Sequence, residues 1–505
     1  MQSNIKPQTF IEYVFKNKRN KATILLAFAA IIIQFSIFKY FYPYAGFIHD
    51  DSFVYLDTAY LNLDINTYMV GYSRFLRIFS VFSNSDTALV AFQYLLIQVS
   101  ALYFLFTLFY FYRPGKLSKF ILLCFMVLNP LFLYMANLIS SDSFFLALSM
   151  VWFTILIWIV HRPNVRLIAW HTLVIFIAFT VRYNALIYLF IASIAFILSR
   201  QPLAWKLGGI VAGLIAIGSF VLYTGNKYQT LTGTWQYSPF GGWQLTNNAM
   251  YAYRYVNNVD RKPSPARFKE LDNMIRAYFD STKDVKKNPQ EALMASTVYM
   301  WDPRSTLYKY RNKLFEKDSS ATELKKWASM GPLYADYGTW LIKQYPLTYA
   351  RYFLWPNANK YYAPPVEFLS TYNMGKNDVE PIAQVWFRFK SQKVITRTKD
   401  LNVNALKLYP ILTGIMNVVF FTGFIFYFIL NDSKSNTLFR KGVILAGTVW
   451  LLNAVFSILS TAAALRFLAF PILLMSTFSL LLIDYIIKSA VTSSVSNVSI
   501  KAIRK

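Results

Sequence analysis

Two adjacent carboxylates and an imidazole follow the first long apolar segment of the chain. The sequence there reads Phe47-Ile48-His49-Asp50-Asp51-Ser52, and an apolar run from Ala22 to Phe38 precedes it. That run is long enough to cross the roughly 30 Å hydrocarbon layer of a bilayer, so we expect Asp50 and Asp51 to lie near a membrane surface. Neighbouring groups set the protonation of such a pair, which is chemically useful only with partners. A solvated loop or a helix N-cap is the structural alternative.

Three further charged residues are predicted to reach the same face of the membrane. Asp142 follows two serines at the start of an apolar segment, Arg182 ends another, and Arg466 opens the last. Charged residues within or at the ends of spans are costly in hydrocarbon and usually turn inward. Taken singly, Asp142 also suits an N-cap, and the arginines suit anchors that reach for lipid phosphates. As a set on one face, they predict a site.

The composition defines the class of protein that must position these residues. Of 505 residues, 56% are hydrophobic, 18% aromatic and only 15% charged, which is too apolar for an ordinary soluble domain. The fold class predicted is mainly α, a polytopic helical membrane protein. In such a chain the net charge of +27 reflects topology and anionic lipid or phosphate ligands rather than nucleic acid. The single cysteine, Cys124, excludes an intramolecular disulfide framework.

Apolar runs and basic clusters together predict a topology of about ten spans. The expected spans are about 22–38, 87–111, 119–136, a fourth that ends near His161, 165–181, 185–199, 207–224, 406–430, 441–459 and 462–487. Basic residues cluster before the first span, at alternate connections and in the tail, so the positive-inside rule places both termini in the cytoplasm. We expect the bacterial plasma membrane as the location, with Asp50, Asp51, Asp142, Arg182 and Arg466 at the outer face.

The same pattern divides the chain into three parts. Residues 1–224 form an N-terminal membrane module, whose first outer loop, 39–86, mixes apolar and charged positions as interfacial helices do. Residues 225–404 lack a run long enough to span and hold seven tryptophans, so we expect a soluble external domain. Residues 405–505 form a C-terminal membrane module with a basic cytoplasmic tail. In the external domain, Trp243 and Tyr251 lie beside amide side chains and are candidates for acceptor binding, with a plain aromatic core as the alternative.

These residue types suit transfer of a sugar from a polyprenyl phosphate. Phosphate leaves without protonation by an acid, but it needs cations, and arginine binds it bidentately. The attacking hydroxyl needs one carboxylate as general base on the opposite face of the sugar, which gives inversion. His49 beside the carboxylates raises a second possibility, a divalent ion, for which oxygen ligands favour Mg²⁺ or Mn²⁺.

The ordered set of motifs resembles the GT-C superfamily of membrane glycosyltransferases, in the branch of protein O-mannosyltransferases and lipid A aminoarabinose transferases. The matching stretches are Asp50 to Ala59, Asn129-Pro130 through Ser140-Ser141-Asp142, Arg182, and Arg466-Phe467 with Pro471. The resemblance implies that Asp50 is the base, that Asp142 helps to hold a metal, and that Arg182 and Arg466 contact the donor phosphate. Asp51 in place of the commoner Glu, His49 before the pair, and the external domain depart from the family pattern.

The resulting expectation is a membrane enzyme that transfers a hexosyl or pentosyl unit from a polyprenyl-phosphate donor to a glycan, lipid or protein acceptor. A ligase of a whole lipid-linked glycan is an alternative within the same chemistry. From other classes, a transporter or flippase of lipid-linked sugars and a non-catalytic envelope assembly protein remain open. A site near the middle of the membrane and an internal inverted repeat would favour the transporter.

Overall fold

The protein folds almost entirely into helices. Its structure, a computed structural model, describes residues 8–398, 400–429, 437–460 and 462–503, with side chains up to Val491 apart from Gln290. No strand occurs among these residues, which confirms the mainly α fold for this part of the chain. Residues 430–436 and 504–505, which hold part of the predicted cytoplasmic basic clusters, lie outside the described residues.

Eight helical segments of the described chain are long and apolar enough to cross a membrane. They are α1 (Lys18–Phe41), α4 (Asp86–Tyr112), α5 with α6 (Lys116–Val127 and Pro130–Asn137), α7 (Ser141–His161), α10 (Leu203–Thr232), α20 (Tyr409–Ile429), α21 (Thr437–Ser460) and α22 (Leu465–Ile503). Two shorter apolar helices, α8 (Val165–Val181) and α9 (Leu186–Leu198), lie at the fifth and sixth predicted spans. An α-helical membrane protein is thus confirmed, whereas the number of crossings stays a prediction.

Pro130 explains the break between α5 and α6. Proline lacks the N–H that an interior helical position needs, but it suits the first position of a helix. Asn129 caps the new helix, since its Oδ1 accepts a hydrogen bond from the Leu131 N–H at 3.0 Å. The Asn-Pro pair therefore restarts the helix and directs α6 toward Ser140 and Asp142.

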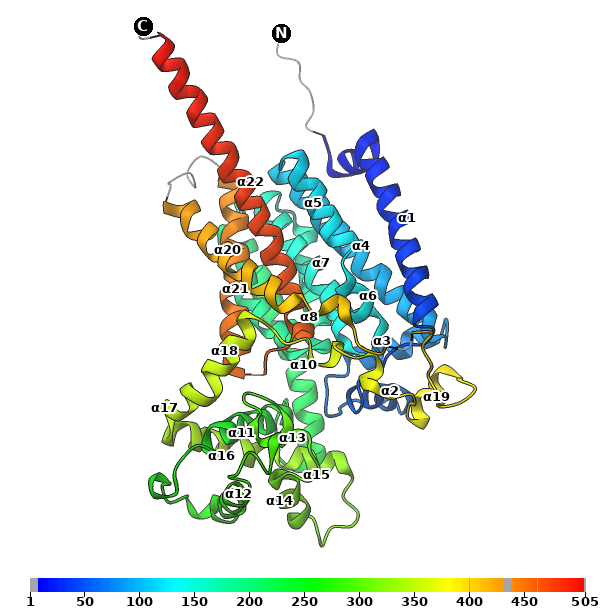
Figure 1. The fold of residues 1–505 in the computed structure, drawn as a ribbon, viewed down its shortest axis with the longest axis vertical. Coiled ribbons are helices and arrows are strands. Elements are labelled where there is room, and N and C mark those ends of the chain that lie inside the picture. The colour runs from blue at the N-terminus through cyan, green and yellow to red at the C-terminus, as the bar shows by residue number, and fades with distance from the viewer. Residues whose placement is uncertain (1–7, 399, 430–436, 461, 504–505) are drawn as a thin grey trace.

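The apolar helices form one bundle, and a second group of helices lies at one end of it (Figure 1). That end is where α7 and α22 begin, and we call it the site end; both chain termini lie at the opposite end (Figure 1). The second group comprises α11 (Pro239–Tyr253), α12 (Lys269–Ser281), α13 (Val298–Trp301), α14 (Thr306–Leu314), α15 (Glu323–Ser329), α16 (Gly331–Gln344) and α17 (Pro346–Tyr349). Its buried residues, from Tyr228 to Phe353, form a hydrophobic cluster of their own, which we call the second core.

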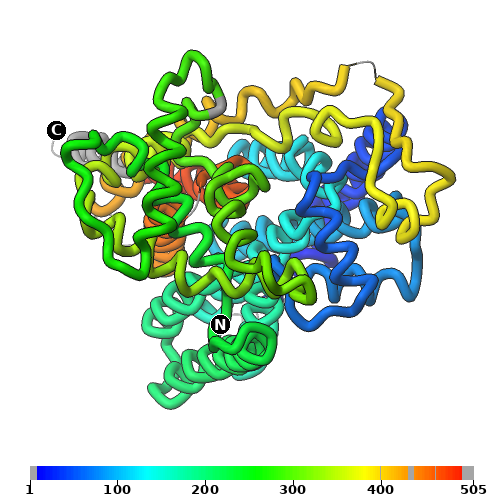
Figure 2. The backbone as a smooth tube through the Cα atoms, turned by 90° about the horizontal axis from the view of Figure 1, so that it is seen from below, coloured from blue at the N-terminus to red at the C-terminus, as the bar shows by residue number. Residues whose placement is uncertain are grey.

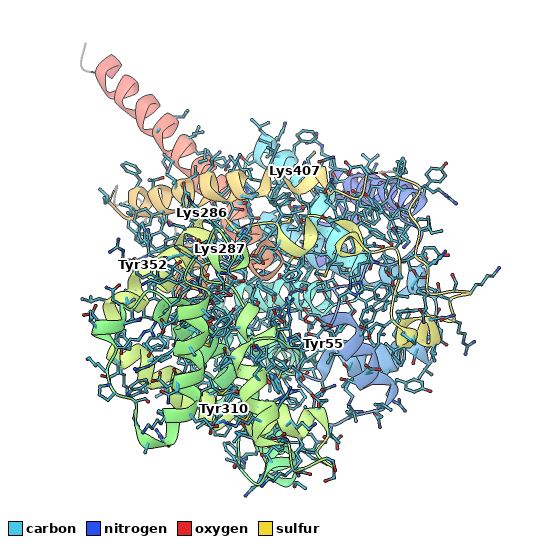
Figure 3. All side chains as sticks on the ribbon, turned by 60° about the horizontal axis from the view of Figure 1, so that its bottom comes forward. Tyr55, Lys286, Lys287, Tyr310, Tyr352 and Lys407 are labelled. Atoms are coloured by element: carbon cyan, nitrogen blue, oxygen red, sulfur yellow. The ribbon has the colours of Figure 1, made fainter. Side chains whose placement is uncertain are left out.

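Close backbone contact between α11 and α16 organises the second core. A Cβ atom at Gly338 of α16 would meet the backbone of Thr246 of α11 at 2.7 Å, so only glycine fits this crossing. The helix α10 runs without interruption from the bundle to this region, since Tyr228 belongs to the second core. Figure 3 shows Tyr310, which belongs to the second core, and Tyr55, which belongs to the loop 39–86.

The stretch predicted as one external domain, 225–404, contributes to both hydrophobic clusters. Its later residues, including Tyr361, Tyr372 and Trp386, belong to the bundle cluster rather than to the second core. This part holds α18 (Trp355–Tyr362) and α19 (Pro381–Phe387). Seen from the site end, it runs from the second core across to the loop 39–86 (Figure 2).

The loop 39–86 holds two short helices, α2 (Asp51–Tyr60) and α3 (Gly71–Ser80). Helix α3 buries Tyr72 and Leu76. Ile78 in the same helix and Phe82 after its end are largely exposed. Apolar side chains on the open side of a short amphipathic helix are typical of helices at a membrane interface. The interfacial position of this loop stays a prediction.

Candidate active site

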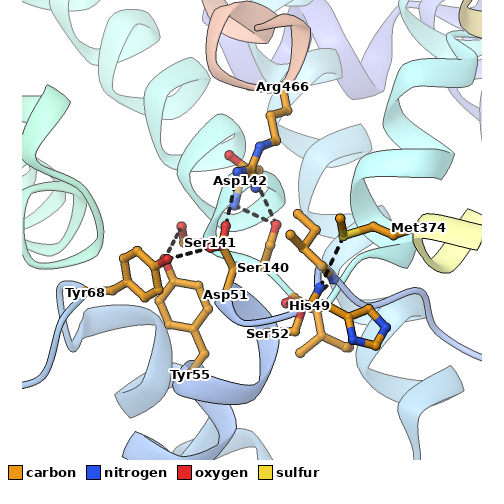
Figure 4. Close-up of polar contacts among 12 residues, drawn as sticks. His49, Asp51, Ser52, Tyr55, Tyr68, Ser140, Ser141, Asp142, Met374 and Arg466 are labelled. Carbon is orange, nitrogen blue, oxygen red and sulfur yellow. Dashed lines mark hydrogen bonds and ion pairs between the residues drawn. The ribbon is translucent and has the colours of Figure 1, made fainter. Parts of the chain in front are cut away.

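Four of the predicted site residues form one charged network at the site end. Arg466 lies 3.2 Å from Asp142 (Nη1 to Oδ2) and 3.1 Å from Asp51 (Nη2 to Oδ2), and Arg182 pairs with the other oxygen of Asp142. Figure 4 shows Arg466 above the two carboxylates. Four different elements supply these side chains, namely the first turns of α2, α7 and α22 and the residue after α8.

Ser140 caps helix α7, which leaves the Asp142 carboxylate available to bind the two arginines. The Oγ of Ser140 accepts a hydrogen bond from the Asp142 N–H at 3.3 Å and donates one to Asp142 Oδ2 at 2.8 Å. Ser140 is therefore the N-cap of α7, a function the sequence also allowed for Asp142 itself. The Asp142 carboxylate instead holds both arginines in place.

The network is buried at one side and open at the other. The side chains of Asp142 and Arg466 are 1% and 7% exposed, whereas those of Arg182 and Asp51 are 18% and 23% exposed. Charges buried this deeply must be paired, and two carboxylates with two guanidinium groups balance. The side of the network that an incoming anion would meet first is therefore formed by Arg182 and Asp51.

Aromatic rings lie against both guanidinium groups. Arg466 lies 4.4 Å from the ring centres of Phe368 and Phe467, and Arg182 lies 4.8 Å from Phe467. Cation–π contacts of this kind help to hold both arginines in place, and the Nη edge of Arg466 faces Asp142 and Asp51. Such an edge suits the oxygens of a carboxylate or a phosphate.

Tyr68 holds the second oxygen of Asp51, which sequence reasoning did not foresee. Its hydroxyl donates to Asp51 Oδ1 at 2.5 Å, and burial together with the Asp51 charge raises the pKa of Tyr68. Its ring contacts Trp301 and Phe240, at centroid distances of 5.7 and 6.4 Å. Both residues pack against the second core, and we call the residues around that core, about 225–354, the second-core region. The second core thereby touches the residue that orients Asp51.

Asp50 and Asp51 face different surroundings. Asp50 is exposed, takes the N-cap position of α2 without a side-chain capping bond, and has φ of 73° and ψ of −59°. A non-glycine residue in such a sparsely populated region costs about 1–3 kcal/mol, and residues of this kind cluster at functional sites. The turn at Asp50 directs Asp51, not Asp50, into the network.

His49 lies near the network but does not join it. Its ring points away from Asp51 and Arg466 (Figure 4), its Nδ1 lies 2.9 Å from Lys376 Nζ, and its ring packs on Phe53. Burial and the Lys376 charge lower the pKa of His49. The structure therefore separates His49 from Asp142, the two residues predicted to share a metal.

The residues at the site do not fit a divalent metal ion in this arrangement. Both oxygens of Asp142 and both of Asp51 already have arginine, serine or tyrosine partners. Among the described residues, no group of three or more His, Cys, Asp or Glu side chains is placed to hold a metal. Two guanidinium groups at the same point would also repel Mg²⁺ or Mn²⁺. The cations of this site are its arginines.

A small cavity adjoins the network. It measures about 20 Å³ and is lined by Arg182, Arg466 and Asp142 with, among others, Asn184, Tyr188 and Asn453. This volume holds about one water molecule, so a phosphate group enters only after neighbouring side chains move. Sequence reasoning missed Asn453 as a residue of the site, although an amide within an apolar segment usually faces the inside of a bundle.

Trp243 and Tyr251 lie in the second core rather than on an open surface. Trp243 is fully buried and donates from Nε1 to the Trp327 carbonyl oxygen at 2.9 Å, and the Tyr251 ring lies 4.5 Å from that of Tyr299. In this structure neither ring is accessible to an acceptor. The arrangement matches the aromatic core considered as the alternative.

Asn357 of α18 joins the end of α21 to Ala463, which lies three residues before Arg466. The Nδ2 of Asn357 donates to the carbonyl oxygens of Ser457 and Ile458 at 2.9 and 3.0 Å, and its Oδ1 accepts from the Ala463 N–H at 2.9 Å. The last carbonyls of a helix lack partners within it, so Asn357 both caps α21 and fixes the approach to α22.

No family model, curated protein or solved structure matches this chain.

Proposed function

We propose that this protein is an integral membrane glycosyltransferase that moves a hexosyl or pentosyl unit from a polyprenyl phosphate to an acceptor. The observation that carries the proposal is the pair of arginines, Arg182 and Arg466, both held on Asp142, with Asp51 on the second Nη of Arg466. Phosphoryl oxygens are the ligands that such a pair fits. The carboxylate beside them supplies the base that an attacking hydroxyl needs.

The reaction follows from an exchange of anions on the arginines. The donor phosphate takes the place of Asp51 on Arg466, which frees the Asp51 carboxylate. The acceptor oxygen then forms a bond to the anomeric carbon while the bond from that carbon to the phosphate oxygen breaks. The electron pair leaves with the phosphate, the arginines stabilise its charge, and Asp51 takes the hydroxyl proton. Attack opposite the leaving group inverts the anomeric centre.

Position favours Asp51 over Asp50 as the base, although the family resemblance assigns Asp50. Asp51 contacts Arg466 and Tyr68, whereas Asp50 is exposed beyond the turn. General-base assistance depends first on reach to the proton. Asp50 then has the supporting role of shaping the turn.

The place of the network supports transfer rather than transport. It is built on the first turns of α7 and α22, which lie at the end of the bundle next to the second group of helices (Figure 1). Secondary transporters instead bind their substrates near the middle of the membrane. With the predicted topology, this end faces the outside of a bacterial plasma membrane, where lipid-linked sugars serve as donors. A ligase of a whole lipid-linked glycan would use the same leaving group and differs only in the size of the transferred unit.

The test is transfer by purified protein in nanodiscs. Polyprenyl phosphates that carry labelled glucose, mannose, galactose or arabinose are incubated with the protein and with an extract of envelope glycans, lipids and proteins. We expect one donor to be consumed, with release of polyprenyl phosphate and label in an inverted linkage. Absence of both binding and consumption for every donor would rule out the proposal.

A further inference from the structure

One helical segment beside the bundle has two unlike faces. It runs from α17 through Ala350–Leu354 to α18, residues 346–362. Every fourth residue on one face is buried, in the order Tyr349, Phe353, Asn357, Tyr361. The opposite face carries Leu347, Arg351, Trp355 and Tyr362, all exposed. The buried residues recur at every fourth position, as in an amphipathic helix, but the outward face carries large apolar side chains together with Arg351 and Asn359.

The end of this segment, α18, packs on two helices that are long enough to cross the membrane, whereas Tyr349 and Phe353 of its first half belong to the second core. The Tyr361 hydroxyl donates to the Trp450 carbonyl oxygen of α21 at 3.2 Å, and Asn417 of α20 donates to the Tyr362 carbonyl oxygen at 3.0 Å. Trp450 lies 10 residues before the end of α21 at Ser460, which corresponds to about 15 Å of helix. Helix α18 therefore lies alongside the last turns of α21, and α17 lies with the second group of helices (Figure 1).

The exposed face continues the apolar surface of those spans. Leu347, Trp355 and Tyr362 are 84%, 67% and 49% exposed, and the neighbouring helices expose aliphatic residues at their own site ends, namely Ile411, Ile415, Val455 and Leu459. Large apolar side chains this open are unusual on a water-facing surface when they form a group. Tryptophan and tyrosine at span ends, with an arginine among them, are the composition of a membrane interface.

We propose that segment 346–362 binds the lipid surface at the site end of the bundle. Leu347, Trp355 and Tyr362 enter the boundary between headgroups and acyl chains, and Arg351 reaches lipid phosphates, as arginine does at interfaces. This binding holds whether or not the protein transfers a sugar. Lipid binding by this segment would also affect the site, because Asn357 on its buried face bonds to the end of α21 and to Ala463, three residues before Arg466. The lipid surface thus supports the helix that positions this arginine.

Spin labels at single cysteines test the proposal directly. The only native cysteine, Cys124, is replaced in a Cys124→Ser background, and labels are attached in nanodiscs at Trp355→Cys and Leu347→Cys. Two matched controls bracket the result. Ile415→Cys reports an exposed position on an apolar helix of the bundle, and Ser320→Cys reports an exposed loop of the second-core region.

The measurement is the accessibility of each label to oxygen, which concentrates in lipid, and to a water-soluble nickel complex. We expect labels at 355 and 347 to favour oxygen, like the label at 415 and unlike the label at 320. Nickel accessibility equal to that at 320 would place the segment in water and overturn the proposal. Low accessibility to both reagents would show that a protein partner or a second copy covers this face, which would also overturn it. Because Leu347 projects outside the packed core, Leu347→Cys gives the answer even where Trp355→Cys fails to fold.

Discussion

At the level of single residues, the two neighbouring carboxylates have different partners and therefore different expected roles. Asp51 accepts hydrogen bonds from Arg466 and Tyr68, and Asp50 lies outside the network on a strained turn. Asp51→Asn keeps the shape and removes the base, so we expect turnover to fall by about two to four orders of magnitude. Donor binding should persist. Asp50→Asn should lose less, and steady-state transfer kinetics of both variants provide the check. A larger loss at Asp50 would return the role of base to that residue.

Tyr68 is expected to act on the reaction through Asp51 alone. Tyr68→Phe removes one hydrogen bond to a charged group, worth about 1.5–3 kcal/mol, which corresponds to a decrease in kcat of roughly tenfold to a hundredfold. KM for the donor should stay the same. Tyr55→Phe is the matched control, since the Tyr55 hydroxyl pairs with Ser141 Oγ at 3.0 Å and not with Asp51. Equal losses in the two variants would show that Tyr68 only packs.

The two arginines should not tolerate lysine. Arg466 reaches Asp142 with one Nη and Asp51 with the other, and a lysine ammonium replaces this fork with a point charge. Arg466→Lys and Arg182→Lys should weaken the binding of polyprenyl phosphate by about tenfold or more, since hydrogen bonds to charged groups are worth about 1.5–3 kcal/mol. Arg254→Lys, at the buried pair with Glu291 in the second-core region, controls for loss of a buried arginine. Unchanged affinity in both site variants would make them interface anchors.

At the level of elements, the contact between the end of α21 and Ala463 before α22 depends on Asn357. Asn357→Ala leaves two carbonyl oxygens and the Ala463 N–H without this partner, so Arg466 should lose its fixed position and the affinity for polyprenyl phosphate should fall. The control is Asn247→Ala, because Asn247 makes similar bonds to Ser296 and Met300 within the second-core region. Thermal unfolding and phosphate binding are measured for both. We expect both to lose stability and only Asn357→Ala to lose affinity; equal loss of affinity would contradict the role of this contact.

The elements also show what the sequence could and could not predict. Apolar runs located the helices, since each predicted span corresponds to an apolar helix. The alternation of basic clusters predicted one face for Asp51, Asp142, Arg182 and Arg466, and these four side chains do lie together. The sequence could not predict contacts between segments that lie far apart in the chain. Nothing local links Asn357 to Ala463 or Phe368 to Arg466, because hydrogen bonds and ring contacts of this kind leave no period or spacing. The same holds for Trp243, whose type suits a sugar platform and a core equally well.

At the level of the whole molecule, the proposed chemistry requires that the site end faces outward. Ser319 lies in an exposed loop of the second-core region, and Thr437 begins α21 at the opposite end of the bundle. In a Cys124→Ser background, Ser319→Cys should react with a membrane-impermeant maleimide in intact spheroplasts, because the basic clusters hold the other end inside. Thr437→Cys should react only after the membrane is permeabilised, which also serves as the control for its accessibility. Reversed labelling would place Arg182 and Arg466 at the cytoplasmic face, where nucleotide sugars are present, and would remove the reason for a lipid-linked donor.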